Sequence, residues 1–225
     1  MKRIWVIGIL SACTCRAQPP VKTPAEMQAE FERDLRGGRE PSPFLIREDP
    51  FWDRTAGPQR PTGQSVSLAR LQHKVPKEAR KSLARALRLS KTGDHEKAAA
   101  ELQTAIQRDP EFADAYGQLG VEYGELKRFR EAETALRHSL ELDPESWLAH
   151  YDLGVILVRS GNPAEAEQNV RRALRESGES ARVHLLLGYL LWQRPETRAE
   201  GLQHVQYAAR TIPAAKKFLR SLQEP

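Results

Sequence analysis

The chain has 225 residues and a formal net charge of +5, from 35 lysines and arginines against 30 aspartates and glutamates. Hydrophobic residues make up 40% of it and aromatic residues 7%, a globular composition that is lean in large core residues. The mild positive charge does not by itself indicate a polyanion-binding protein, and the abundance of Ala, Leu, Glu and Arg favours helices.

Residues 1–17 have the pattern of a secretory signal peptide. A basic start at Lys2 and Arg3 precedes an apolar run from Ile4 to Leu10, and small and polar residues follow. The run is too short to remain as a membrane-spanning anchor. We therefore expect secretion across the inner membrane, and a periplasmic or lipid-anchored protein in the cell envelope.

Two processing sites compete in this segment. Leu10-Ser11-Ala12-Cys13 resembles the lipobox of bacterial lipoproteins, and that resemblance implies a signal ending at residue 12 and an acylated Cys13. The alternative is a cut after Ala17, and a third possibility is no processing. Both cysteines lie here, so the remainder has neither a disulfide framework nor a thiolate metal site.

Residues 18–64 read as a proline-rich, largely irregular linker. One stretch within it, between residues 25 and 36, has the apolar spacing of a short amphipathic helix. A cluster of large apolar residues follows and has two interpretations, docking on the chain's own helical domain or on a partner: Phe44, Leu45, Ile46, Phe51 and Trp52. Residues 65–78 form a lead-in that places Pro76 in the first turn of the next helix.

A 34-residue period begins at residue 79 and defines units 79–112, 113–146, 147–180 and 181–213. The second unit shows the pattern best, and its recurring positions are Tyr116, Leu119, Gly120, Tyr123, Phe129, Ala132, Leu136, Asp143 and Pro144. Equivalent residues in the other units include Ala86, Gly93, Ala98, Leu102, Asp109, Pro110, Leu153, Gly154, Gly161, Ala166, Leu187, Gly188, Gly201 and Val205.

These residues resemble those of the tetratricopeptide repeat (TPR) family. The resemblance implies an all-α solenoid of about four helix-turn-helix repeats, and residues 214–225 are expected to form a C-terminal capping helix. The last unit needs one extra residue near Pro195. Gly120, Gly154 and Gly188 are expected to let the two helices of a repeat approach closely.

Proline pairs are expected to mark helix starts. Asp109 and Asp143 are predicted to cap the next helix, with Pro110 and Pro144 at its first position. Asn162-Pro163 is predicted to do the same for the second helix of the third unit, where Glu165 suits the positive end of the helix dipole.

In TPR proteins the first helix of each repeat lines a concave groove, and the resemblance implies a partner-binding site there. The alternative is that half of these side chains only pack between helices. The groove candidates are Leu83, Leu87, Gln118, Val121, Tyr151, Asp152, Val155, Val158, Arg159, Arg182, Leu185, Tyr189 and Trp192.

A basic stretch at residues 70–91 carries eight lysines and arginines and one glutamate. Four of the cations fall on one helical stripe: Lys77, Lys81, Arg85 and Arg88. The stripe is either a solvated face or a docking surface for an anionic membrane or polymer. Without interleaved aromatic residues it does not favour nucleic acid.

No catalytic or cofactor-binding motif is present. The six histidines lack metal-ligand spacing, and there is no glycine-rich phosphate loop and no Gly-x-Ser-x-Gly sequence. His150 and His184 are 34 residues apart and are expected to serve packing. The sequence therefore predicts a scaffold that binds a peptide or helix of a larger assembly, not an enzyme, with electrostatic docking through the basic stripe as the alternative.

Overall fold

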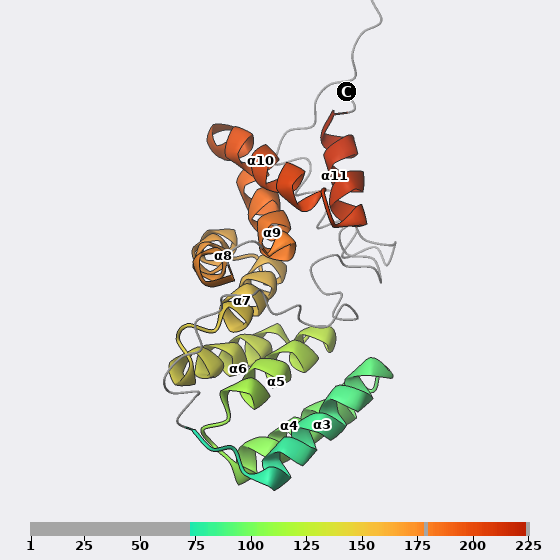
Figure 1. Ribbon diagram of the computed structural model, residues 1–225, viewed down its shortest axis with the longest axis vertical. Helices are drawn as coiled ribbons and strands as arrows, with labels where there is room; N and C mark the ends of the chain where they lie inside the picture. Colours follow the sequence, from blue (N-terminus) through green and yellow to red (C-terminus); the bar gives the residue numbers. More distant parts are fainter. Residues whose placement is uncertain (1–72, 178–179, 224–225) are drawn as a thin grey trace, which may run out of the picture.

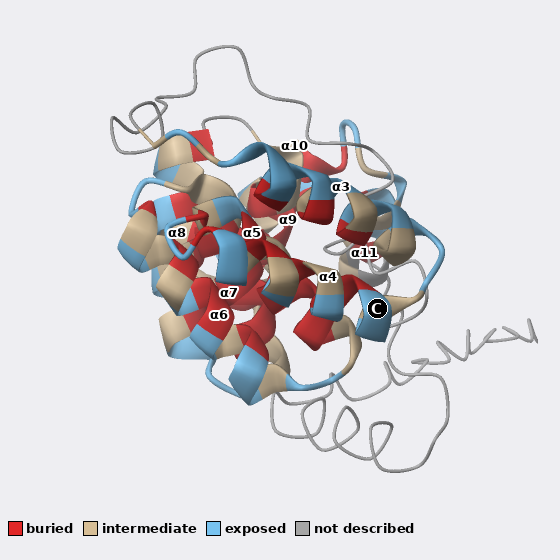
Figure 2. Cartoon of the chain, turned by 90° about the horizontal axis from the view of Figure 1, so that it is seen from below, coloured by how far each residue is buried: buried red, intermediate tan, exposed pale blue. Residues whose placement is uncertain are grey.

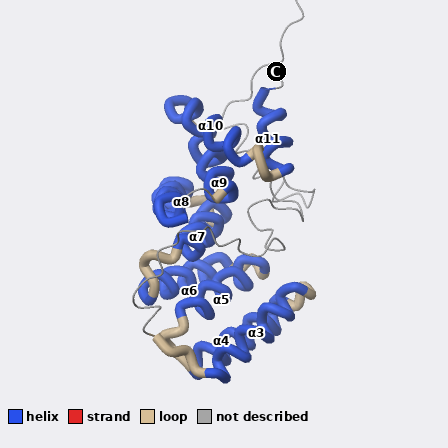
Figure 3. Tube along the Cα trace, viewed as in Figure 1, coloured by secondary structure: helices blue, strands red, loops and turns tan. Residues whose placement is uncertain are grey.

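The computed structural model describes residues 73–177 and 180–223. Within these ranges the regular structure is entirely helical, as Figure 3 shows. The signal peptide, Cys13, the 18–64 linker and most of the 65–78 lead-in lie outside the described residues.

The helices form consecutive antiparallel pairs, and we call the first helix of each pair the A helix and the second the B helix. The A helices are α3 Lys77–Lys91, α5 Ala113–Glu125, α7 Trp147–Arg159 and α9 Ala181–Trp192. The B helices are α4 His95–Arg108, α6 Phe129–Leu142, α8 Pro163–Ser177 and α10 Arg198–Ala208.

Two shorter elements complete the last unit. A 3-10 helix, η1 Pro195–Thr197, occupies the turn between α9 and α10, where the spacing predicts an extra residue. Helix α11 Pro213–Gln223 packs on α10 in the position predicted for the capping helix.

The pairs stack one after another along the long axis of the molecule (Figure 1). The main contacts join the two helices of a pair and each B helix to the next A helix, with a smaller contact between α5 and α7. Because each hairpin has an apolar face that it cannot bury alone, stacking supplies the core. The TPR-type helical solenoid predicted from the sequence is confirmed.

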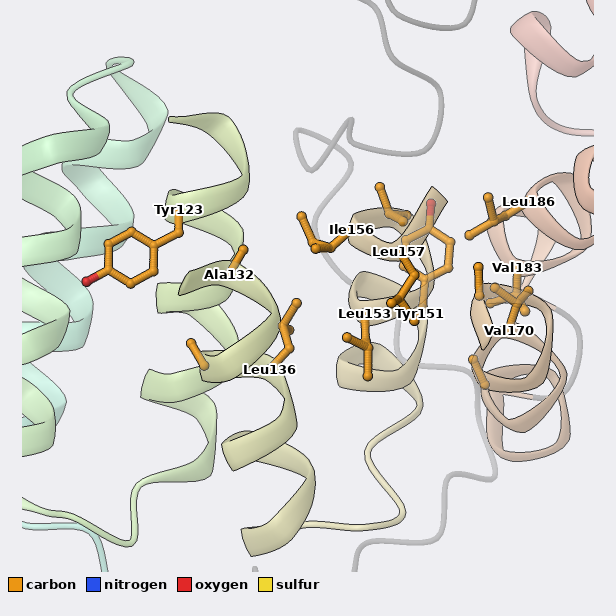
Figure 4. Packing of buried hydrophobic residues seen from close by; sticks show 14 of the residues in the cluster. Tyr123, Ala132, Leu136, Tyr151, Leu153, Ile156, Leu157, Val170, Val183 and Leu186 are labelled. Atoms are coloured by element: carbon orange, nitrogen blue, oxygen red, sulfur yellow. The ribbon is translucent and has the colours of Figure 1, made fainter. Parts of the chain in front are cut away.

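The core is a continuous apolar seam between the pairs (Figure 2). In the middle of the stack, Leu136 of α6, Ile156 and Leu157 of α7 and Val170 of α8 are completely buried (Figure 4). Full burial of a side chain of this size stabilises the fold by about 1.5–3 kcal/mol. Alanines fill the closest approaches, which explains why few large residues suffice.

Glycines set the distance between the helices of a pair, as predicted. A Cβ added at Gly120 would lie 2.5 Å from Leu136 Cγ, and one at Gly154 would lie 2.5 Å from Val170 Cγ2. In the last pair the close atoms include backbone, because a Cβ at Gly188 would lie 2.9 Å from the carbonyl oxygen of Gly201 and 2.9 Å from the nitrogen of Val205.

The predicted capping role of Asp109 and Asp143 is wrong. Both residues are C-caps of the preceding B helices, and the next A helices begin at Ala113 and Trp147. A proline forces the residue before it into an extended backbone, and Asp109 has φ −150° and ψ 90°. The aspartate-proline pairs therefore end one helix and leave a turn before the next.

The predicted position of Pro163 at the start of a helix is confirmed, whereas a capping role of Asn162 stays a prediction. Helix α8 begins at Pro163, and Glu165 lies in its first turn. Here the proline stands at the first helical position, where its missing N–H costs nothing.

The A-to-B turns of the first three pairs each contain one residue with a left-handed backbone conformation. Gly93 and Gly161 have φ of 80° and 86°, and the equivalent residue of the second pair, Lys127, has φ of 59°. Left-handed backbone costs a residue with a side chain about 1–2 kcal/mol, whereas glycine adopts it freely.

Replacing Lys127 by glycine is therefore expected to raise the free energy of unfolding by about 0.5–1 kcal/mol. The relief of backbone strain stabilises the fold, and the larger conformational entropy that glycine has in the unfolded chain offsets part of this gain. Urea unfolding followed by circular dichroism measures the change. Gly161→Ala serves as the converse control and should be destabilising. A Lys127→Gly variant less stable than the wild type would contradict the explanation.

Candidate functional site

The A helices carry a row of apolar side chains at equivalent positions of the four repeats. The row consists of Leu87, Val121, Val155 and Tyr189, one residue from each A helix. Leu87 is 40% exposed, and among the described residues no other large hydrophobic side chain is classed as exposed. Val121 and Val155 are buried, and Tyr189 is partly exposed. The row thus runs along the stack and opens to solvent at α3.

A second row lies one turn earlier on the same helices. Leu83 is partly buried, and Tyr151 and Leu185 are buried within the apolar core. Figure 4 shows Tyr151 on α7 among the buried residues of the core. These two rows contain seven of the residues that the sequence predicts for the groove, and the structure brings them onto consecutive A helices.

Polar groove candidates are distributed unevenly. Gln118, Arg159 and Arg182 are partly exposed, whereas the carboxylate-bearing Asp152 is buried at 2% exposure. The burial of Asp152, Tyr151 and Leu185 agrees with the alternative that part of the candidate set packs between helices. Their role in partner binding stays a prediction.

The two aromatic residues expected to be the strongest anchors also serve the fold. The ring of Tyr189 lies 6.3 Å from that of Phe218 in the capping helix α11, and burial raises the pKa of the Tyr189 hydroxyl. The guanidinium of Arg198 lies 5.0 Å from the ring centre of Trp192. Truncating either aromatic residue would therefore disturb the end of the stack as well as any binding.

The repeat pattern decides the family. The sequence pattern described as "Tetratricopeptide repeat" matches residues 83–121, 118–175 and 156–216, which together span more than half of the chain. The chain belongs to the tetratricopeptide repeat family. No match is found among curated proteins.

Solved structures with the same fold include two of MamA. The structure described as "MamA 41-end from Desulfovibrio magneticus RS-1" has a TM-score of 0.55 at 20% identity, covering 61% of this chain and 77% of the other. The MamA RS-1 ArsTM double mutant has a TM-score of 0.54 at 20% identity, covering 61% and 76%.

A third similar structure is YrrB, which its title calls "a TPR protein with an unusual peptide-binding site". It has a TM-score of 0.52 at 24% identity and covers 60% of this chain and 69% of its own. At these identities the three likenesses show the TPR fold.

The basic stripe is less open than its sequence suggests. Lys81 pairs with Glu78 at 2.7 Å, and Arg85 pairs with Glu101 of the neighbouring α4 at 2.9 Å. Lys77 and Arg88 are exposed at the surface of α3. The contribution of Glu101 could not be read from the sequence of 70–91, because it comes from the B helix of the TPR hairpin.

Histidines take part in hydrogen bonds rather than only in packing. Nδ1 and Nε2 of the buried His150 lie 3.0 Å from Asn169 Oδ1 and from the carbonyl oxygen of Pro144. His184 and His204 approach to 2.8 Å between their Nδ1 atoms. Burial lowers the pKa of His204. The pairing joins residues of α9 and α10, so only the TPR hairpin geometry reveals it.

No group of three or more His, Cys, Asp or Glu side chains in the described part of the chain is placed to hold a metal ion. None of the helices described here is long and apolar enough to cross a membrane.

Proposed function

We propose that this TPR stack is an extracytoplasmic scaffold that binds a peptide or helix of a larger envelope assembly on its A-helix face. The observation that carries the proposal is the row from Leu87 to Tyr189, because its two end residues are accessible: Leu87 is exposed and Tyr189 is partly exposed, whereas Val121 and Val155 between them are buried. An amphipathic helix or extended peptide uses accessible apolar side chains of this kind as anchors.

The structural likeness to YrrB, whose title names a peptide-binding site, agrees with this role. The extracytoplasmic location is proposed from the signal-type pattern of residues 1–17. Mass spectrometry of the mature N-terminus distinguishes an acylated chain that begins at Cys13 from a chain cut after Ala17.

Leu87 offers the cleanest test, because it is exposed and its replacement should leave the fold intact. Peptides selected by the full chain from a displayed random library should lose about tenfold in affinity for a Leu87→Asp variant, since a charge replaces an apolar contact. Fluorescence anisotropy with the selected, labelled peptides measures the change.

Ala100→Asp is the matched control, since Ala100 is exposed on the B helix α4 and receives the same charge. Its peptide affinity should stay within twofold of the wild type. Equal affinities of wild type and Leu87→Asp for every selected peptide would refute the assignment of this face.

Electrostatic docking through the basic stripe is the less favoured function. Two of its four cations, Lys81 and Arg85, already have carboxylate partners. An exposed cation that is neutralised by its own chain has less charge to offer a membrane surface.

A further inference from the structure

A cavity of about 740 Å³ opens between the B helices α6 and α8. Its floor includes His150 and Leu153 of α7, and its lining contains no residue of the two A-helix rows. The cavity is therefore separate from the A-helix face, and it is formed by the second and third repeats.

The lining of the cavity is rich in arginine. Four arginines and two glutamates contribute to it. On the α6 side Arg137 Nη2 donates to Glu133 Oε1 at 2.8 Å and to Glu165 Oε1 of α8 at 2.6 Å. On the α8 side Arg171 pairs with Glu167 and Glu200. These two arginines are neutralised, and Arg137 joins the two helices that form the walls.

The other two arginines differ from them. Arg172 and Arg175 are three residues apart on α8, so they share a face of the helix. Both are exposed and border the cavity. Within the described residues neither guanidinium group has a hydrogen bond or an ion pair. Two guanidinium groups thus stand side by side at the rim without a carboxylate.

The interior of the cavity is mixed in polarity. Leu140, Pro144 and Leu153 supply apolar surface, and the amide side chains of Gln168 and Asn169 border it. The imidazole of His150 is held by Asn169 and by the Pro144 carbonyl, so the floor is fixed in position. Such a lining can receive an apolar side chain and hydrogen-bond a peptide backbone.

We propose that this cavity is a second protein-binding site, which takes an acidic segment of a partner protein and pairs its carboxylates with Arg172 and Arg175. Guanidinium groups match carboxylates in a two-bonded geometry. A flat membrane surface does not enter a concavity between two helices. Two unpaired arginines are also few for duplex DNA, which carries one negative charge per about 1.7 Å of its axis. A peptide that alternates acidic and apolar residues fits both the rim and the interior.

The test uses a short fluorescein-labelled peptide of alternating glutamate and leucine, and the same peptide with glutamine for glutamate. Anisotropy titration of the full chain should show the acidic peptide binding at least about tenfold more tightly. An Arg172→Glu/Arg175→Glu double variant should lose about tenfold in affinity for the acidic peptide, and Arg172→Gln/Arg175→Gln should lose less. Thermal unfolding followed by circular dichroism checks that the exposed substitutions leave the fold unchanged.

Lys77→Glu/Arg88→Glu is the matched control, because it reverses two exposed cations of the basic stripe and changes the net charge equally. Its affinity should stay within twofold, as should that of Leu87→Asp, which keeps this site separate from the A-helix face. Equal losses in the two charge-reversal variants would mean a non-specific charge effect and overturn the proposal. Equal binding of the two peptides by the wild type, or displacement of the acidic peptide by phosphatidylglycerol vesicles, would also overturn it.

Discussion

Replacing Gly188 by alanine is expected to lower the free energy of unfolding by about 2–3 kcal/mol, a large share of the stability of a small helical domain. The new Cβ would lie 2.7 Å from Val205 Cγ2, 2.9 Å from the Gly201 carbonyl oxygen and 2.9 Å from the Val205 nitrogen. Two of these atoms belong to the backbone of α10. Relief therefore requires α9 and α10 to separate, and this loss exceeds the helix propensity of about 1 kcal/mol that alanine brings.

Gly117→Ala provides the matched comparison on α5. Its Cβ would meet only the Ser139 hydroxyl oxygen, at 3.3 Å, and no backbone. Its unfolding free energy should lie within about 1 kcal/mol of the wild type, since a small shift of Ser139 and the helix propensity of alanine oppose each other. Equal urea midpoints for Gly188→Ala and the wild type would show that the last pair adjusts without cost.

Replacing His95 by alanine is expected to cost about 2 kcal/mol. His95 Nδ1 lies 2.8 Å from Glu122 Oε2, and Glu122 is only 1% exposed. A carboxylate that accepts this bond makes Nδ1 the donor. Removing the donor leaves a buried charge without its partner, which costs more than losing an exposed pair. The expected loss of stability is smaller than for a fully buried pair, because His95 is 26% exposed.

A double-mutant cycle measures this coupling by chemical unfolding. His95→Ala/Glu122→Leu should recover most of the lost stability, because no buried charge remains. The surface pair His138–Glu141, 2.7 Å apart, is the control, and Glu141→Ala should cost under about 0.5 kcal/mol. If His95→Ala and Glu141→Ala had equal effects, the burial of Glu122 would carry no energetic weight.

The stacking of helix pairs could be predicted because it depends on short-range regularities. Gly120, Gly154 and Gly188 recur with the repeat, and each needs only its own hairpin to explain it. The prediction for Asp109 and Asp143 failed because an aspartate before proline fits two local structures, a helix N-cap and an extended C-cap. The choice between them depends on where the A helix packs, and Ala113 and Trp147 start those helices.

Ion pairs between different helices could not be predicted from the sequence. Arg85 is neutralised by Glu101, and the cavity between α6 and α8 joins residues from two repeats. Such contacts depend on rotamers and on the angle between hairpins, neither of which a 34-residue period fixes. For the same reason the sequence left open which groove candidates are exposed and which pack between helices, because periodicity gives the face of a helix and not what covers it.

The sequential pattern of contacts, from each helix to the next one in the chain, also affects how the protein folds. Because the main contacts join consecutive helices, few distant segments must meet before stabilising interactions form. A chain built in this way can begin to fold at any hairpin and can fray from either end while its middle stays ordered. The middle hairpins, which also form the walls of the arginine-lined cavity, would then be the last to open.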